Sequence, residues 1–144
     1  MKLPPQHLAE VVNALQAAAE SGKGAEKRRA ARMEVQGNVV VAPLAKDGTV
    51  GKSFTAVTRD ISFVGVGLLQ SRPLEKGQQV VVRLPRGHKP ALFMLCSVMH
   101  VRPLADGLFI IGVEFLNIAA MKDESLLDPV EGAQMQRTRQ VILN

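Results

Sequence analysis

The feature that most constrains the fold is a series of six short runs in which apolar and polar residues alternate. These runs cover residues 33–41, 54–59, 66–69, 80–84, 92–101 and 109–115. Turns or loops are expected between them, at residues 47–48, 60–65, 76–77, 85–90 and 105–107. Alternation with a period of two is typical of half-buried strands, and no helical pattern interrupts the series. The sequence therefore predicts a mainly β domain, either an antiparallel barrel or a sandwich.

Helical patterns lie at the two ends of the chain. Residues 5–21 place four apolar side chains on one helical face: Leu8, Val11, Val12 and Leu15. Pro5 suits the start of this helix and Gly22 its end. Near the other end, Asp128 to Glu131 has the spacing of a capping box, so a second helix is expected from there to about Leu143.

The charge of the chain indicates the kind of partner. The chain holds 18 Lys and Arg against 13 Asp and Glu, a formal net charge of +5. A basic domain favours partners that carry phosphate, such as a nucleotide, a nucleic acid or an anionic membrane surface. Tyrosine and tryptophan are absent, so a nucleotide site would rely on arginine planes or on one of five phenylalanines for stacking.

The single cysteine, Cys96, excludes an internal disulfide and a zinc site built from cysteines. It lies in the apolar run 91–96, so we expect a buried, unreactive thiol. No window of the sequence is long and apolar enough to cross a bilayer, and polar residues such as Glu10 interrupt the apolar residues near the N-terminus. A cytoplasmic location without membrane insertion is therefore expected.

The densest charge in the chain lies just before the first strand, at Lys27, Arg28, Arg29 and Arg32. Guanidinium groups bind phosphate oxygens bidentately, and they also match the O6/N7 edge of guanine. Taken alone, such a run equally fits a solvated basic linker that binds nothing.

A second polar stretch, residues 60–65, follows the second predicted strand. The carboxylate of Asp60 suits the N1–H and N2–H₂ donors of guanine, the hydroxyl of Ser62 suits a phosphate, and Gly65 allows close approach of the backbone. The simpler interpretation is a turn that Asp60 and Ser62 cap, with Gly65 and Gly67 marking a bulge.

The sequence holds no arrangement typical of an active site or a metal site. His7, His88 and His100 each lack a second ligand at metal spacing. There is no Ser–His–Asp order, P-loop or dinucleotide fingerprint, because the pair Gly65 and Gly67 lacks the third glycine and the following helix. We therefore expect a protein that is not an enzyme and that needs no cofactor or metal.

The two polar stretches together resemble the PilZ family. An Arg-x-x-x-Arg element, Arg28 to Arg32, precedes the first strand, and an Asp-x-Ser-x-x-Gly element, Asp60 to Gly65, lies between the second and the third. The runs 66–68 and 111–115 also look like that family, so the resemblance covers about residues 26–120. It implies a six-stranded antiparallel barrel, here with flanking N- and C-terminal helices, that binds the bacterial second messenger cyclic di-GMP.

The resemblance also implies which residues bind the ligand. These are Arg28, Arg32, Asp60, Ser62 and Gly65, with Arg29 in support. The expected domains are an N-terminal helix (1–22), a basic ligand-binding arm (23–32), the barrel (33–117) and a C-terminal helical segment (118–144).

Three functions remain open on this basis. The first is a receptor in which cyclic di-GMP orders the self-repelling arm onto the barrel, moves the N-terminal helix and so signals to a partner protein. The second is an adaptor that binds a protein without ligand, as family members without intact motifs do. The third is a basic barrel that binds nucleic acid, which the scarcity of aromatic residues disfavours. The terminal helices are candidate contacts of a homodimer.

Overall fold

The computed structural model describes residues 1–19, 33–121 and 124–128. Its elements, in chain order, are α1 (Pro5–Ala19), β1 (Met33–Glu34), β2 (Asn38–Leu44), β3 (Phe54–Ile61), β4 (Gly65–Gln70), β5 (Gln79–Arg86), β6 (Lys89–Pro103), the 3-10 turn η1 (Ala105–Gly107), β7 (Phe109–Ile118) and the 3-10 turn η2 (Glu124–Leu127). The predicted N-terminal helix is confirmed over α1. The basic arm and most of the predicted C-terminal helix lie outside the described residues.

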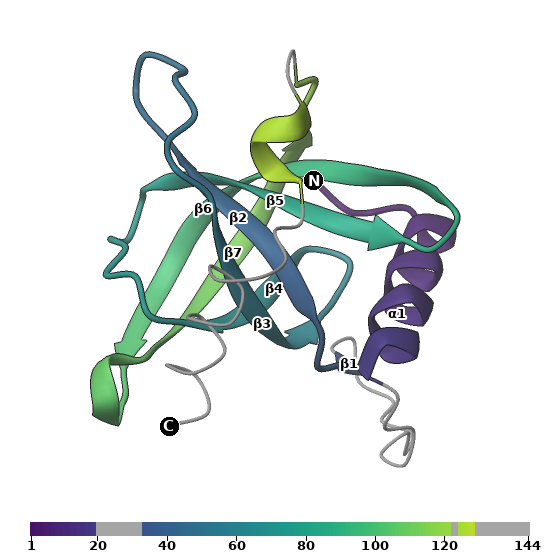
Figure 1. Cartoon of the computed structure of the whole chain (residues 1–144), viewed down its shortest axis with the longest axis horizontal. Helices are drawn as coiled ribbons and strands as arrows, with labels where there is room; N and C mark the ends of the chain where they lie inside the picture. Colours follow the sequence, from purple (N-terminus) through teal and green to yellow (C-terminus); the bar gives the residue numbers. More distant parts are fainter. Residues whose placement is uncertain (20–32, 122–123, 129–144) are drawn as a thin grey trace.

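The strands form a closed antiparallel barrel (Figure 1). The order around it is β3-β2-β5-β6-β7-β4, and the pairing of β3 with β4 closes the ring. The short β1 pairs with β3 beyond the end of β2, so β1 and β2 act as one interrupted strand. The predicted six-stranded barrel is therefore confirmed.

The first predicted strand, 33–41, is not continuous. β1 and β2 both pair with β3, but the register shifts by one residue between them. Thr58 of β3 spans the break, because its hydroxyl donates to the carbonyl of Val35 at 2.6 Å and its N–H donates to the carbonyl of Gly37 at 2.8 Å. The extra residue makes this a bulge, which the alternation in the sequence does not reveal.

The prediction that this strand is half-buried holds for residues 35–38 and is wrong from Val39 onward, because that part of β2 is buried on both faces. Val39 and Val41 face the barrel interior, whereas Val40 and Ala42 belong to an apolar cluster on the outer wall. Leu127 of η2, which is fully buried, covers that outer cluster. The covering residue lies far along the chain, so the pattern of the strand itself does not predict it.

Residues 85–90, predicted as a loop, are mostly strand. Arg86 of β5 pairs with Lys89 of β6, so Gly87 and His88 alone form the hairpin turn. Gly87 adopts a φ of +71°, which glycine tolerates without strain. Pro85 lies where the register of β5 shifts against β6, a position at which a missing N–H interrupts no regular ladder.

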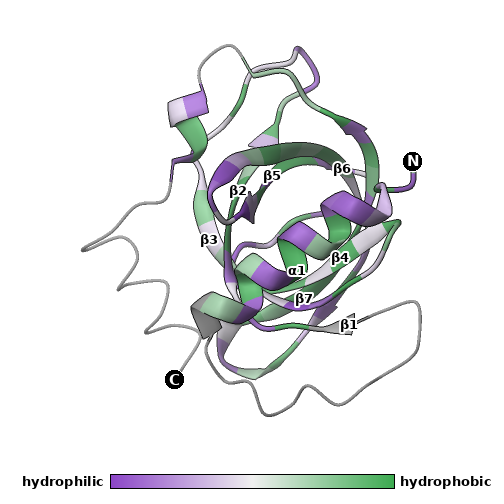
Figure 2. Cartoon of the chain, turned by 90° about the vertical axis from the view of Figure 1, so that its right-hand side faces the viewer, coloured by the Kyte–Doolittle hydropathy of each residue, from purple (hydrophilic) through white to green (hydrophobic). Residues whose placement is uncertain are grey.

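Aliphatic side chains from the strands and from α1 fill the barrel interior. α1 lies across one open end of the barrel (Figure 2), and all four residues of its predicted apolar face belong to the core: Leu8, Val11, Val12 and Leu15. Cys96 is fully buried in the same core, as predicted, and burial raises the pKa of its thiol. The thiol is therefore protonated and unreactive at neutral pH.

The charged side of α1 is held by the hairpin of β5 and β6. The carboxylate of Glu10 accepts hydrogen bonds from Nζ of Lys89 at 2.5 Å and from Nη1 of Arg86 at 3.1 Å. Nδ1 of His7 lies 3.4 Å from the same carboxylate. The bond from Lys89 is the main reason that the pKa of Glu10 falls to about 2, with smaller contributions from His7 and Arg86.

Replacing Glu10 with glutamine should change the pH dependence of stability. Because the pKa of this carboxyl is lowered in the folded protein, its ion pairs stabilise the fold above the ordinary pKa of 4.5 and stop doing so as the pH falls toward about 2. The urea midpoints of parent and E10Q should therefore differ above pH 4.5 and converge below it. E75Q, at an exposed loop residue, is the control. A constant difference between parent and E10Q across this range would contradict the interpretation.

Candidate functional site

A groove with a volume of about 270 Å³ lies on the outer wall of the barrel, where β3, β4, β7 and β6 run side by side. Its lining includes Asp60, Ser62 and Gly65. These are the predicted site residues that fall within the described part of the chain, and the structure brings all three together.

One row of residues crosses the floor of the groove. Asp60 of β3 pairs with Gly67 of β4, Gly67 pairs with Gly112 of β7, and Gly112 pairs with His100 of β6. Neighbouring strands lie about 4.8 Å apart, so three strand spacings, about 14 Å along the curved wall, separate Asp60 from His100. The row therefore has two glycines in the middle, a carboxylate at one end and an imidazole at the other.

The two glycines make room for the side chains at the ends of the row. A β-carbon at position 67 would lie 2.7 Å from Oδ1 of Asp60, and one at position 112 would lie 2.5 Å from Nε2 of His100. Neither glycine has a positive φ, so space rather than backbone torsion requires them. Asp60 and His100 thus both lean inward over the glycine floor.

The turn beside this floor is shorter than the predicted stretch 60–65, because Asp60 and Gly65 lie on strands. The N–H of Ser62 donates to the carbonyl of Gly65 at 2.9 Å, and the N–H of Val64 donates to Oγ of Ser62 at 3.2 Å. A β-carbon on Gly65 would overlap the carbonyl oxygen of Val113 on β7. Ser62 therefore caps the turn, as the simpler interpretation of the sequence predicts, while it also lines the groove.

The residues before α1 rest on the same turn. The N–H of Leu3 donates to the carbonyl of Phe63 at 2.7 Å, and the side chain of Leu3 is fully buried. The N-terminal ammonium of Met1 donates to the carbonyl of Phe115 at 3.2 Å. The start of the N-terminal segment is thus attached directly to the candidate site.

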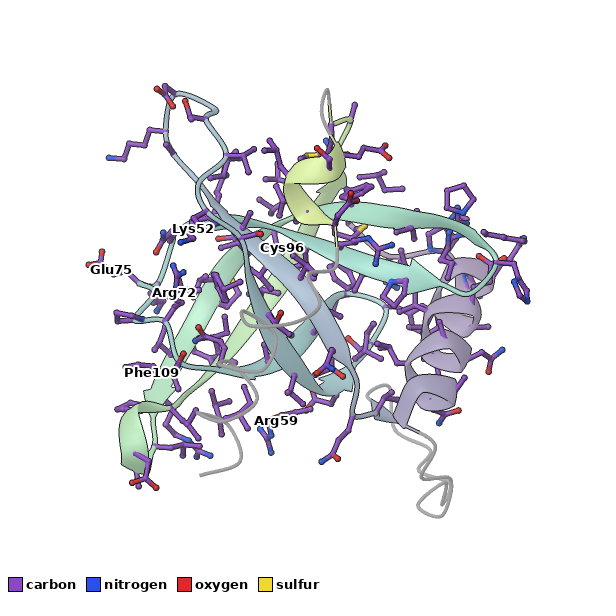
Figure 3. The ribbon with its side chains drawn as sticks, in the orientation of Figure 1. Lys52, Arg59, Arg72, Glu75, Cys96 and Phe109 are labelled. Carbon is purple, nitrogen blue, oxygen red and sulfur yellow. The ribbon has the colours of Figure 1, made fainter. Side chains whose placement is uncertain are left out.

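The charges that line the groove are mixed. Arg59 lies where the register of β3 shifts against β4, and its side chain projects outward from β3 (Figure 3). Asp60 and Glu114 add two carboxylates to the lining. In the described part of the chain, the groove wall therefore offers little net attraction for phosphate. The residues predicted to bind phosphate lie outside the described residues: Arg28, Arg29 and Arg32.

Several groove residues are not among those predicted from the sequence: Gly67, Gly112, His100 and Glu114. Glycines in the interior of a strand often mark a place where a ligand or another backbone comes close. Gly67 and Gly112 fit that rule, but their alignment with His100 depends on the register of three strands.

Neither a metal centre nor a membrane-spanning helix is found within residues 1–19, 33–121 and 124–128. No three His, Cys, Asp or Glu side chains gather there in a way that would hold a metal ion. No helix of that part is long and apolar enough to cross a membrane.

Comparison with known proteins gives one family match. The sequence model of the PilZ domain matches residues 26–129 of the chain. A search of curated proteins found no match.

Several solved structures are similar to the chain. The Bacillus subtilis inhibitor of motility, MotI/DgrA, is 17% identical with a TM-score of 0.45, over 71% of this chain and 48% of that one. The PilZ domain of YcgR from Escherichia coli, solved with c-di-GMP, is 16% identical with a TM-score of 0.45, over 82% of this chain and 90% of that one. The K. pneumonia MrkH–c-di-GMP complex is 17% identical with a TM-score of 0.45, over 70% and 48%. The chain thus spans about half the length of MotI/DgrA and of MrkH.

Proposed function

Because the chain belongs to the PilZ domain family, we propose that it is a cytoplasmic receptor for cyclic di-GMP and not an enzyme. The observation that carries the proposal is the row from Asp60 across two glycines to His100, directly beside the turn capped by Ser62. Because the two glycines lack side chains, the Asp60 carboxylate and the His100 ring lie low over the strands, which leaves the groove open to a planar base. The neighbouring carboxylate suits the N1–H and N2–H₂ donors that distinguish guanine.

The phosphates are bound by the basic arm in this proposal. The groove wall combines Arg59 with two carboxylates, so it does not supply enough positive charge for a dianion. Arg28 and Arg32 supply that charge through bidentate hydrogen bonds, with Arg29 in support. Each such charge-assisted bond contributes about 1.5–3 kcal/mol, and several of them offset the ordering of the arm, about 1–2 kcal/mol per residue.

Signalling follows from the connection between arm and helix. Residues 20–32 link α1 to β1, so a ligand that holds the arm against the groove also acts on the end of α1. A change in the position of α1 alters the surface offered to a downstream protein or to a second copy of the chain. The output is therefore a change in protein contacts, and the ligand leaves unaltered.

Titration calorimetry with cyclic di-GMP tests the proposal. The parent should bind, and Asp60→Ala should bind at least about tenfold more weakly, because a charge-assisted hydrogen bond contributes about 1.5 kcal/mol or more. Asp47→Ala is the matched control, since it removes a carboxylate from the turn between β2 and β3, outside the groove. Absence of heat with the parent protein at tens of micromolar cyclic di-GMP would reject the receptor proposal.

Two other outcomes would point to the remaining functions. Binding of an oligonucleotide that falls steeply with salt, and that cyclic di-GMP does not displace, would indicate a nucleic-acid-binding barrel. Capture of a partner protein to the same extent with and without cyclic di-GMP would indicate an adaptor that does not respond to ligand.

A further inference from the structure

His100 has an unusual position for an exposed side chain. It lies on the outer wall of β6, exposed to solvent, yet its ring does not extend away from the sheet. The ring lies over Gly112 of the neighbouring strand, close enough that a β-carbon there would overlap Cε1 and lie 2.5 Å from Nε2. The ring therefore occupies the space that any other residue at position 112 would fill.

The glycine beneath the ring is not explained by the barrel alone. Glycine weakens the interior of a strand, and position 112 needs no positive φ. The inward neighbours Ile111 and Val113 are buried in the core, so the fold requires their side chains rather than the absence of one between them. What glycine at this position does provide is room for the ring of His100 over β7, at the edge of the groove.

We infer that His100 is a ligand-binding residue whose imidazole ring packs against a purine base in the groove, at the opposite end of the floor from Asp60. The inference rests on the proposed function, because it adds a residue to the same groove. Among the described residues that line the groove, His100 carries the one aromatic ring. The chain has no tyrosine or tryptophan, so few other side chains can stack on a base.

The geometry of the row suits this role. Asp60 and His100 lean toward each other across about 14 Å of the curved wall, over two glycines. A base that enters the groove above the two glycines meets a carboxylate on one side, which accepts hydrogen bonds from its donors, and a planar ring on the other. Stacking is tolerant of base identity, so Asp60 selects guanine while His100 contributes affinity.

Calorimetry with cyclic di-GMP on full-chain variants tests the inference. His100→Ala should weaken binding about tenfold, within the range for loss of one base–aromatic contact. His100→Phe keeps a planar ring and should bind almost as tightly as the parent, whereas His100→Asn keeps hydrogen-bonding atoms without a ring and should resemble His100→Ala. His88→Ala, in the turn between β5 and β6, removes an exposed histidine outside the groove and should bind like the parent.

Gly112→Ala tests the ring's position rather than its presence. The added methyl group occupies the place of Cε1 and turns the imidazole away from the floor, so this variant should also weaken binding, with its fold checked by thermal unfolding. In proton NMR spectra of the parent, the Hε1 resonance of His100 should shift on addition of cyclic di-GMP, while that of His88 should not.

The outcomes distinguish the role of His100 from the receptor proposal. If the parent binds cyclic di-GMP but His100→Ala binds equally well, the role of His100 is wrong and the receptor proposal stands. If the Asn variant binds like the parent and the Phe variant does not, the contact is a hydrogen bond and the ring contact is wrong. If the parent itself does not bind, the receptor proposal and this inference both fail.

Discussion

Replacing Arg32 with alanine should weaken the binding of cyclic di-GMP by at least about a hundredfold. A guanidinium makes two parallel hydrogen bonds to a phosphate or to the O6/N7 edge of guanine, and each contributes about 1.5–3 kcal/mol. Their joint loss amounts to about 3 kcal/mol or more, at a factor of ten for each 1.4 kcal/mol. The groove wall does not compensate, because Arg59 is accompanied there by Asp60 and Glu114. Calorimetry measures the change in Kd, and Arg28→Ala should behave similarly.

Arg32→Lys separates charge from geometry. Lysine keeps the positive charge and loses the planar fork, so this variant should bind more weakly than the parent and more tightly than Arg32→Ala. Arg83→Ala, on β5 outside the groove lining, removes the same charge elsewhere and should leave binding unchanged. Binding of Arg32→Lys as tight as that of the parent would show that the contact is not bidentate.

Replacing Phe115 with alanine should lower the free energy of unfolding by about 3–5 kcal/mol. Phe115 lies on β7, fully buried in the barrel core and paired with Cys96 of β6. Each strand of a closed barrel is held by two neighbours, so the wall does not readily collapse into the cavity that the ring leaves. Urea unfolding followed by circular dichroism measures the loss.

Leu116→Ala is the matched control for this variant. The next residue along β7 faces outward and is 37% exposed, so its truncation should lower the free energy of unfolding by less than about 1 kcal/mol. Equal losses for Phe115→Ala and Leu116→Ala would contradict the assignment of inner and outer faces on β7.

The sequence predicts well those elements in which apolar residues recur at the regular spacing of a helix or a strand. The apolar face of residues 5–21 and the alternation of Ile111, Val113 and Phe115 are both reproduced, because each is set by local spacing. The sequence predicts a loop over residues 85–90 because Pro85 and Gly87 usually indicate one, and this prediction is wrong. The structure places Pro85 at a shift of register and Gly87 in a two-residue turn, which needs knowledge of the pairing between β5 and β6.

In the candidate site, too, residues of one local motif are predicted from the sequence, whereas residues brought together by strand pairing are not. Asp60, Ser62 and Gly65 are predicted because they share one short motif whose spacing is visible in the sequence. Gly112 and His100 are far from that motif in the chain, and they join it through the pairing of β4 with β7 and of β7 with β6. Burial on both faces of β2 has the same origin, since η2 covers its outer face from the other end of the chain.

The contacts of the N-terminal segment determine how α1 is able to move. Leu3 fixes its start to the turn at Phe63, and Glu10 fixes its middle to the hairpin through Lys89. Because its apolar residues as far as Leu15 are also buried in the core, α1 is held along most of its length, and Ala19, which leads into the basic run, lies about one helical turn beyond Leu15. We therefore expect a pull applied at Ala19 to displace mainly the last turn of the helix, beyond Leu15, and least the part fixed at Leu3 and Glu10.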